Sequence, residues 1–324
     1  MKPRIGFLGT GWIGRNRMEA LLGTGLVEPV AICDPSPECL EQAGELAVKA
    51  QRVASLDEML EGNIDGVVIA TPSALHAAQS IQALAAGKAV FCQKPLGRTA
   101  QETLAVVNAA RNADRLLGVD LSYRHTEAMK AIGDLVRSKE LGDIFAIDLT
   151  FHNAYGPDKP WFYDPEQSGG GCVVDLGVHL VDLALWTLGF PEVENVDAQL
   201  LSAGHRLEPG QVEDYAVATF RAGPAQVRLA CSWRLNAGRD AVIKAAFYGT
   251  RGGAALRNVN GSFYDFTAHR FIGTDAQQLT GPPDAWGARA AADWAERLAR
   301  SARFDPLAEE FVRAAEVLDR IYGR

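Results

Sequence analysis

The sequence has few cysteines and no pair of them at metal-binding spacing. The chain contains five, scattered along its length, and none belongs to a C-x-x-C pair; they are Cys33, Cys39, Cys92, Cys172 and Cys231. We therefore expect free thiols in a reducing, cytoplasmic compartment, with neither disulfides nor a metal site.

Long apolar runs and runs of positive charge are also missing. No apolar stretch is expected to reach the roughly 18 residues of a membrane helix. The first four residues lead directly into an expected strand, which leaves no room for a signal peptide. A net charge of −8 without a Lys/Arg run argues against a nucleic-acid partner. The 324 residues, 48% of them hydrophobic, predict an ordinary globular protein of one or two domains.

A glycine motif near the start is the most informative stretch. An apolar run at 5–8 precedes Gly9, Gly11 and Gly14, which match G-x-G-x-x-G and lead into a helical pattern. The first glycine permits a tight turn, the second lets the backbone approach a pyrophosphate, and the third allows close packing of helix and strand. The start of the helix then presents free N–H groups to phosphates. Because glycine-rich turns are common, a purely structural turn explains the motif alone about equally well.

Asp34 shifts the balance toward a dinucleotide site. It follows the apolar run at 27–33, at the distance beyond Gly14 where a carboxylate binds the adenosine ribose hydroxyls. A carboxylate there repels the 2′-phosphate of NADP, and residues 35–37 offer no arginine to receive one, so we expect NAD. The residues expected to bind the cofactor here are Gly9, Thr10, Gly11, Trp12, Ile13, Gly14 and Asp34.

Strands alternate with helices through the first 120 residues. Thr99 caps one of these helices, and Glu102 stands at its capping-box position. Further strands are expected at 66–70, 89–92 and 116–121, and helices at about 38–50, 74–86 and 99–113. This alternation predicts an α/β fold with a doubly wound parallel Rossmann sheet over residues 1–121.

The pattern changes in residues 122–324, where strands follow one another with few helices. Helices are expected at about 127–138, 173–188 and 306–322, and strands at 144–150, 193–201, 212–220, 226–234, 241–248, 253–257 and 261–266. Such a run of strands predicts an α+β domain with a large, open, mostly antiparallel sheet. The helix at 306–322 could pack back on the first domain. An uncovered sheet face predicts self-association.

Two motifs follow the parallel strands at the edge where open α/β sheets bind ligands. Lys94, in Cys92-Gln93-Lys94-Pro95, could hydrogen-bond a substrate hydroxyl and stabilise negative charge on its oxygen. A lone lysine at a strand end is more often a solvated surface charge. Thr71-Pro72 and His76 follow the preceding strand on the same side, although an isolated histidine is more often structural.

A third motif begins with three glycines, Gly169–Gly171. Asp175 and His179 follow at i and i+4, on one helix face, as in an orienter–base pair. Gly177 costs about 1 kcal/mol relative to alanine inside a helix, which suggests a close approach there. A first-turn charge and a packed core histidine explain the same residues about equally well.

The loop at 153–163 combines amide, carboxylate and aromatic groups, the chemistry of a polyol or sugar site. For any single residue an Ω-loop with aromatic anchors is the better explanation. Tyr123 and Arg124 open the second domain and could point into the same cleft. The residues expected to contact substrate are Tyr123, Arg124, Asn153, Tyr155, Trp161, Asp175 and His179.

Four motifs together give the chain a resemblance. They are Gly9–Gly14, Ala70–His76, Ala86–Pro95, and the glycines 169–171 with Asp175, His179 and Asp182. Over nearly its whole length the chain resembles the glucose–fructose oxidoreductase/inositol dehydrogenase/MocA family. The resemblance implies Lys94 and Asp175 at the substrate, His179 as general acid/base, and an open sheet that often forms dimers or tetramers. Cofactor-side residues are then also Thr71, Pro72, His76, Gln93 and Lys94.

One residue departs from the family pattern, which usually has Glu-Lys-Pro where this chain has Gln93-Lys94-Pro95. Glutamine keeps an acceptor, adds donors and loses the charge. We therefore expect Gln93 to keep its part in cofactor positioning and to alter the local tuning of Lys94.

The resulting hypothesis is a cytoplasmic, NAD-dependent oxidoreductase that moves a hydride between nicotinamide and a carbinol carbon of a sugar, cyclitol or related polyol. Its catalytic residues would be Lys94, Asp175 and His179, and its assembly a homodimer or homotetramer, without a nucleic-acid or membrane partner. Three alternatives stay open: an NAD-dependent glycoside-cleaving enzyme that oxidises its substrate transiently, a reductase of C=N or C=C bonds, and a non-catalytic regulator that binds NAD and a sugar.

Overall fold

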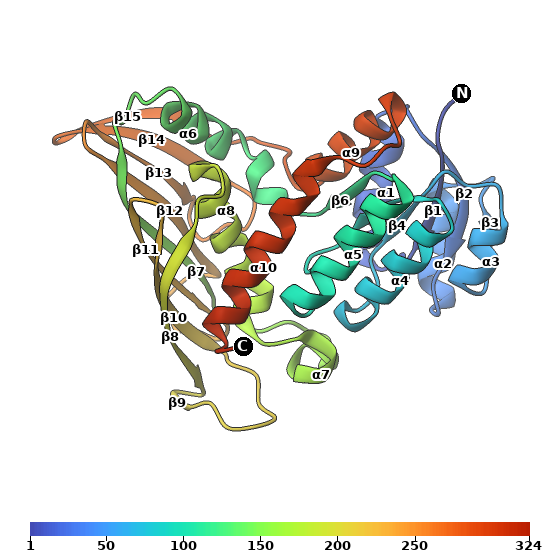
Figure 1. The fold of residues 1–324 in the computed structure, drawn as a ribbon, viewed down its shortest axis with the longest axis horizontal. Coiled ribbons are helices and arrows are strands. Elements are labelled where there is room, and N and C mark those ends of the chain that lie inside the picture. The colour runs from blue at the N-terminus through green and yellow to red at the C-terminus, as the bar shows by residue number, and fades with distance from the viewer. The chain divides into compact units, whose positions relative to one another are not determined.

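The computed structural model describes residues 1–324, which form two compact units. The first unit comprises residues 1–120 and 288–312, and the second comprises residues 121–287 and 313–324. The chain therefore leaves the first unit, builds most of the second, and returns (Figure 1).

The first unit is built on a six-stranded parallel sheet in the order β3-β2-β1-β4-β5-β6. The order reverses between β1 and β4, which confirms the predicted doubly wound Rossmann topology. Strands β4 and β5 are buried along their whole length, as expected of central parallel strands. The strands are β1 (Arg4–Leu8), β2 (Glu28–Cys33), β3 (Gln51–Arg52), β4 (Gly66–Ile69), β5 (Ala89–Cys92) and β6 (Leu117–Val119).

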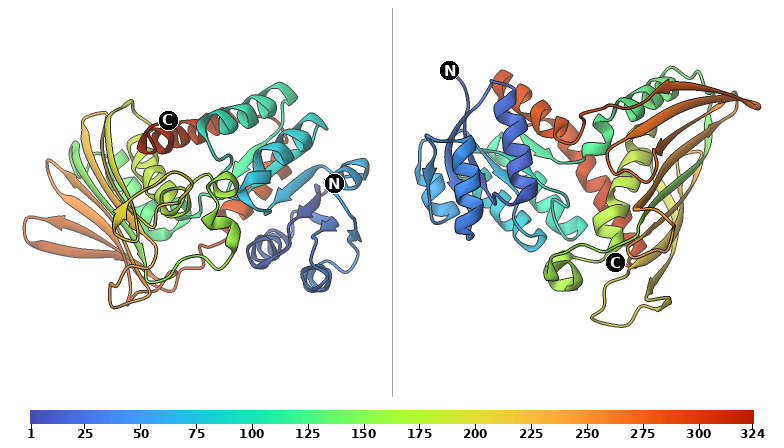
Figure 2. Two further views of the ribbon diagram at one scale, coloured as in Figure 1. Left: turned by 90° about the horizontal axis from the view of Figure 1, so that it is seen from below. Right: turned by 180° about the vertical axis from the view of Figure 1, so that it is seen from behind.

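Helices cover both faces of this sheet, because right-handed crossovers on the two sides of β1 place their helices on opposite faces. Helices α4 and α5 contact each other, and α1 contacts α2 and α9 (Figure 2). The helices are α1 (Trp12–Gly23), α2 (Pro37–Leu46), α3 (Leu56–Glu61), α4 (Ser73–Ala85), α5 (Ala100–Ala113) and α9 (Arg289–Arg300).

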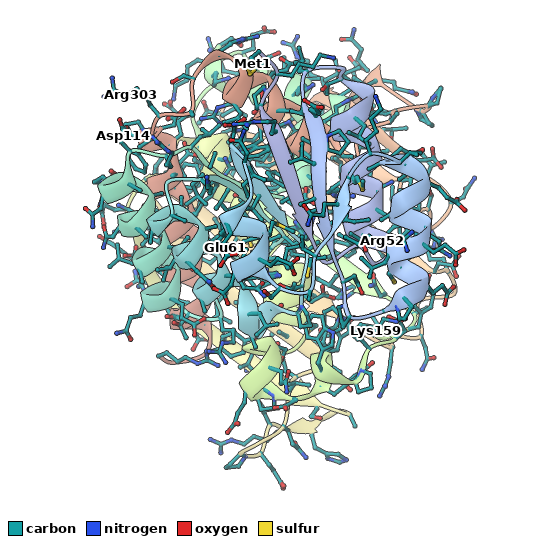
Figure 3. All side chains as sticks on the ribbon, turned by 90° about the vertical axis from the view of Figure 1, so that its right-hand side faces the viewer. Met1, Arg52, Glu61, Asp114, Lys159 and Arg303 are labelled. Carbon is teal, nitrogen blue, oxygen red and sulfur yellow. The ribbon has the colours of Figure 1, made fainter.

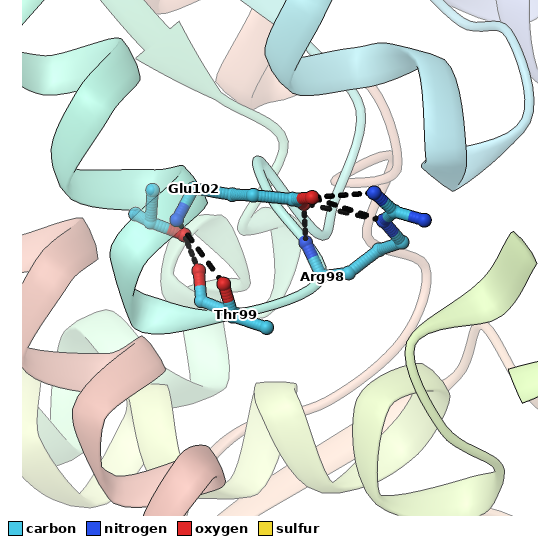
Figure 4. A network of polar contacts seen from close by, with 4 residues as sticks. Arg98, Thr99 and Glu102 are labelled. Carbon is cyan, nitrogen blue, oxygen red and sulfur yellow. Dashed lines mark hydrogen bonds and ion pairs between the residues drawn. The ribbon is translucent and has the colours of Figure 1, made fainter. Parts of the chain in front are cut away.

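The predicted cap of α5 is confirmed, and it pins the loop that follows Lys94. The hydroxyl of Thr99 accepts from the Glu102 backbone N–H at 3.1 Å. The Glu102 carboxylate accepts from the backbone N–H of Arg98 at 2.7 Å and pairs with its guanidinium (Figure 4). A side chain at Gly97 would come within 2.7 Å of Glu102, so the loop closes tightly on the helix.

Helix α9 was not expected from the sequence, and it changes the domain division. Its start at Ala288 carries no side-chain cap, so its alanine-rich segment lacks a start signal. Trp294 is buried against Phe91 of β5, with ring centroids 5.8 Å apart. After α9, Arg303 pairs with Asp114 at 2.9 Å (Figure 3). The first unit therefore includes residues 288–312 in addition to residues 1–120.

The second unit contains a nine-stranded sheet in the order β15-β14-β13-β12-β7-β11-β10-β8-β9. Only β7 and β11 run parallel, which confirms the mostly antiparallel sheet. The strands are β7 (Ile144–Asn153), β8 (Val193–Ser202), β9 (His205–Arg206), β10 (Tyr215–Ala222), β11 (Ala225–Ser232), β12 (Ala241–Gly249), β13 (Gly253–Asn258), β14 (Phe266–Ile272) and β15 (Asp275–Thr280).

The prediction of a strand at 261–266 was wrong. Residues 259–262 form a turn, in which the Ser262 N–H donates to the Val259 carbonyl at 2.8 Å and Gly261 has a φ of +83°. Asn260-Gly261-Ser262 is a sequence of turn formers, and this chemistry outweighs the apolar residues that follow it. The sheet continues instead through β14 and β15, which the sequence pattern missed.

Helices cover one face of this sheet and leave the other bare (Figures 1 and 2). Helix α8 contacts β7 and β11, and α6 contacts β13, β14 and β15. The bare face has a hollow of about 510 Å³, lined in part by Thr150, Arg228 and Lys244. The helices are α6 (Glu127–Arg137), α7 (Pro165–Ser168), α8 (Val178–Leu188) and the end of α10 (Glu309–Ile321), with a π-helical turn at Val173–Gly177 before α8.

One helical stretch corrects the expectation that no segment is long enough to span a membrane. Residues Pro165–Leu188 are long and apolar enough by length and composition alone. Of the most apolar 18 consecutive residues in this stretch, 83% are buried inside the protein, as expected of a core helix.

Candidate functional site

The three glycines of the first loop have different surroundings. A side chain at Gly9, whose φ is +84°, would come within 2.6 Å of the Ala70 backbone. A side chain at Gly14 would overlap the carbonyl oxygen of Gly9. At Gly11 no atom beyond its two neighbours in the chain lies within 4 Å of the position that a Cβ would take. Gly9 and Gly14 therefore serve packing inside the chain, whereas Gly11 leaves space beside the start of α1.

The start of α1 can receive an anion. Gly11 gives no side-chain cap, and the first turn contains no acidic residue, so its N–H groups have no internal acceptor from a side chain. Thr10 is fully buried, and its hydroxyl has no partner within the protein. A buried orphan hydroxyl beside free N–H groups is the donor set that fits a pyrophosphate.

Asp34 is fixed beside this loop by two backbone donors. Its carboxylate accepts from the N–H of Thr10 at 2.6 Å and from the N–H of Ser36 at 2.9 Å. These bonds orient the carboxylate at the end of β2, next to the glycine loop. The indole of Trp12, at the start of α1, is 61% exposed. The predicted residues of this loop therefore lie together in the first unit.

His76 joins two loops and has no free ring nitrogen. One ring nitrogen lies 2.7 Å from the Pro95 carbonyl oxygen, and the other lies 2.7 Å from the Thr71 carbonyl oxygen. Burial lowers the pKa of His76, while the two carbonyl contacts oppose that shift. The ring therefore connects the loop after β4 to the loop that carries Lys94, and the neighbouring Thr71 hydroxyl donates to Gln79 at 2.6 Å.

Gln93 is held by a buried acid that the sequence analysis did not identify. Its amide donates to Asp120 at 2.5 Å, and the Arg17 Nε donates to the same carboxylate at 2.5 Å. Asp120 is 1% exposed. A glutamate at position 93 would set a second carboxylate against Asp120, so the amide at this position matches its neighbour. Gln93 thereby holds the peptide before Lys94 to the end of β6.

In the second unit, Asp175 and His179 lie on consecutive helical segments. Asp175 is in the π turn, a wider form of helix that is frequent at functional sites, and His179 is in the first turn of α8. The indole N–H of Trp233 donates to the Asp175 carboxylate at 3.0 Å. His179 is 8% exposed, and its ring centroid lies 4.8 Å from that of Tyr123.

Tyr123 and Arg124 have structural contacts of their own. The Tyr123 ring packs against Phe151, Phe266 and Trp286. Burial, and next the charge of Asp175, raise the pKa of Tyr123, so its hydroxyl stays a donor. Arg124 makes a two-pronged ion pair with Asp182 of α8, at 2.8 Å and 2.5 Å. Arg124 therefore braces α8, and Tyr123 forms one wall around His179.

The loop after β7 brings an unsatisfied acceptor and exposed aromatic surface. The side-chain oxygen of Asn153 is buried and has no partner within the protein, which leaves it available to a ligand donor. Tyr155 is 52% exposed. The rings of Trp161 and Phe162 stack with centroids 3.8 Å apart. These groups are suited to hydroxyls and to the apolar faces of a sugar ring.

Three residues that hold these segments escaped sequence analysis: Asp120, Trp233 and Glu213, whose carboxylate accepts from the backbone N–H groups of Gly171 and Val173. Trp233 lies at the end of an apolar run and was expected to be a strand residue. Asp120 and Glu213 gave no motif, since each obtains its partners from segments far away in sequence. The acidic pair Glu213-Asp214, just before an alternating strand, was the one available signal.

Comparison with protein families agrees with this geometry. Residues 3–121 match the model described as "Oxidoreductase family, NAD-binding Rossmann fold". Residues 129–255 match the model described as "GFO/IDH/MocA C-terminal domain". The two matches follow one another in the order of the two units.

Individual relatives point to the same family. The chain is 27% identical to D-glucoside 3-dehydrogenase of Escherichia coli (strain K12), over 78% of this chain and 74% of the relative. It is 26% identical to inositol 2-dehydrogenase of Rhizobium meliloti (strain 1021), over 80% and 76%. The solved structure of levoglucosan dehydrogenase with NADH and levoglucosan has the same fold, with a TM-score of 0.85, 21% identity, and coverage of 100% of this chain and 97% of that one.

The glycine loop generates a first prediction. Gly11→Ala should keep the melting temperature of the wild type, because its side chain meets open space, and should weaken NAD binding at least tenfold because it obstructs approach to α1. Gly14→Ala is the matched contrast and should lower the melting temperature, because its side chain overlaps Gly9. Thermal unfolding and NAD titration of tryptophan fluorescence measure both. Unchanged NAD affinity in Gly11→Ala would exclude the loop as the pyrophosphate site.

Gln93 and Asp120 generate a second prediction. Gln93→Glu should lower the free energy of unfolding by about 1–3 kcal/mol at neutral pH, because it sets a second buried carboxylate against Asp120 and removes the amide donor between them. The exchanged pair Gln93→Glu with Asp120→Asn restores one amide and one carboxylate and should recover most of that loss. Urea unfolding of the single and double variants checks the pair. Additive losses in the double variant would contradict a direct interaction.

Proposed function

The chain belongs to the GFO/IDH/MocA family of oxidoreductases, and from that premise we propose that it is an NAD-dependent dehydrogenase of a sugar, cyclitol or related polyol. One observation carries the proposal in the second unit: Asp175 and His179 share a buried helix, with Asp175 held by Trp233. In the first unit, the glycine loop and Asp34 are suited to NAD. We assign cofactor binding to the first unit and substrate binding to the second.

The proposed roles follow from the chemistry of each side chain. Bound NAD supplies a hydride acceptor. His179 takes the proton of the substrate hydroxyl, and Asp175 orients the imidazole. Lys94 stabilises negative charge on the substrate oxygen. General acid–base help of this kind contributes about 10²–10⁴-fold to the rate.

Cofactor preference rests on Asp34. Its carboxylate is fixed by Thr10 and Ser36, so it cannot turn away from a 2′-phosphate without losing two hydrogen bonds. Within residues 35–37 there is no basic side chain to offset that repulsion. NAD is therefore the proposed cofactor over NADP.

The substrate class rests on the names of relatives and on the groups around β7. Relatives are named for glucosides and inositol, and a structural neighbour binds levoglucosan. Asn153 offers an unsatisfied acceptor, and Tyr155 and Trp161 offer aromatic surface for a sugar ring. Tyr123 packs beside His179. Arg124 supports the site indirectly, because its ion pair with Asp182 braces α8.

The proposed setting is a cytoplasmic self-assembled enzyme without a nucleic-acid or membrane partner. The bare face of the nine-stranded sheet supports self-association into a dimer or tetramer, since Phe145, which lines a hollow on that face together with Tyr248, is more than half exposed.

Two other enzymatic functions share this scaffold, and both differ in their products. A glycoside-cleaving enzyme would release sugar without net NADH, and a reductase of C=N or C=C bonds would consume NADH without oxidising a polyol. A non-catalytic regulator would bind NAD and a sugar without turnover. The presence of Lys94, Asp175 and His179 together favours the dehydrogenase.

A panel of sugars, inositols and sugar acids, scored for NADH formation with NAD and for NADPH formation with NADP, tests the proposal. We expect turnover with at least one polyol, and a kcat/KM that is higher with NAD. Sugar release without NADH would favour glycoside cleavage. Comparable kcat/KM with both cofactors would remove the argument from Asp34.

His179→Ala should lower kcat by at least about 100-fold, because the hydroxyl proton loses its acceptor. NAD affinity should stay at the wild-type value, because the cofactor is assigned to the first unit. Steady-state kinetics and an NAD titration measure the two effects separately. Near-normal turnover in this variant would remove His179 from the mechanism.

A further inference from the structure

Glu213 is a fully buried carboxylate that holds the backbone at the start of the π turn. It accepts from the Gly171 N–H at 3.0 Å and from the Val173 N–H at 2.8 Å. Its own backbone carbonyl accepts from the Cys172 N–H at 3.0 Å. Three successive N–H groups at this helix start are therefore satisfied by one residue. Burial raises the pKa of Glu213, so the donors around it have to offset the cost of its charge.

A segment that follows α10 completes this arrangement. The hydroxyl of Tyr322 donates to the Glu213 carboxylate at 2.8 Å, and Arg324 donates to the Gly169 carbonyl at 3.0 Å. Side chains at Gly170 and Gly171 would overlap the Tyr322 hydroxyl and the Glu213 carbonyl. Two of the three glycines that begin this motif, Gly170 and Gly171, are thus required by contacts inside the protein.

The neighbour of Glu213 links this arrangement to Asp175. The backbone carbonyl of Asp214 accepts from the Trp233 N–H at 2.7 Å. The indole of Trp233 donates in turn to Asp175. A closed ring of contacts therefore runs from Val173 through the pair 213–214 and Trp233 to Asp175, which is two residues beyond Val173.

On the basis of the function assigned above to Asp175 and His179, we propose that Glu213 and Tyr322 are positioning residues that set where the π turn holds Asp175. Glu213 fixes the backbone at the start of the turn, and Tyr322 fixes Glu213. Trp233 fixes the Asp175 carboxylate at the other end of this ring of contacts. A shift at Glu213 moves Asp175 relative to Trp233, and with it the orientation of the His179 imidazole.

The test uses the full chain without cofactor, labelled with ¹⁵N in its six tryptophans. The indole N–H signal missing in Trp233→Phe identifies Trp233, and Asp175→Asn shows where that signal lies without the carboxylate. Tyr322→Phe removes one hydroxyl and keeps the ring, and Glu213→Gln keeps the size and loses the charge. Tyr248→Phe is the matched control, because Tyr248 lines a hollow on the bare sheet face.

We expect Tyr322→Phe and Glu213→Gln to move the Trp233 signal toward its Asp175→Asn position. The misplaced Asp175 should lower kcat roughly 10- to 100-fold at unchanged NAD affinity. Tyr248→Phe should change neither quantity. A signal and a kcat that stay at wild-type values, or a loss of stability without a shift of the signal, would overturn the proposal. If Glu213→Gln fails to fold, the Trp233 signal and the kcat of Tyr322→Phe alone decide whether the proposal holds.

The signal needs no turnover, so the two proposals fail separately. An absence of activity with every substrate in the wild type would refute the proposed function, and the position of the Trp233 signal would still decide whether Glu213 and Tyr322 set the turn.

Discussion

The need of buried carboxylates for hydrogen-bond donors organises this protein more than any other interaction. An acid removed from water is costly unless donors surround it. Here the donors come from the loops that carry the proposed chemistry. The buried Asp120 binds Gln93, the buried Glu213 binds the start of the π turn, and the half-buried Asp34 binds the glycine loop in the same way. Each acid thereby fixes the backbone next to a residue that we place in cofactor or substrate binding.

The glycines of the two glycine-rich motifs are required for two different reasons, and the motifs alone do not show which reason applies to which glycine. Gly9 and Gly14 are required by contacts inside the first unit, and Gly170 and Gly171 by contacts inside the second. Within the G-x-G-x-x-G motif, Gly11 alone leaves space that the protein itself does not use. The argument for a bound ligand therefore rests on Gly11 and on the unpartnered hydroxyl of Thr10. The other four motif glycines named above are explained by the close approach of neighbouring segments of the protein.

Local patterns in the sequence predicted much of the fold, because strand–helix alternation, the Thr99 cap and the glycine motif depend on residues that are close in sequence. The misses have physical causes. Asn260-Gly261 stops a strand that hydrophobicity alone would start, and the uncapped start at Ala288 hides α9. The partners of Gln93 and Asp175 are Asp120 and Trp233, which come from other elements, so no spacing rule could have supplied them. His76 gave a motif but no hint of its two carbonyl contacts.

The burial of Trp294 on the Rossmann sheet has a consequence for biosynthesis. All six strands of that sheet emerge from the ribosome long before α9, which covers β5 and β6. During that interval the apolar surface around Phe91 and Gly118 lacks its indole cover. The nascent first unit therefore stays incomplete until almost the whole polypeptide has been translated, and it must avoid aggregation in the meantime.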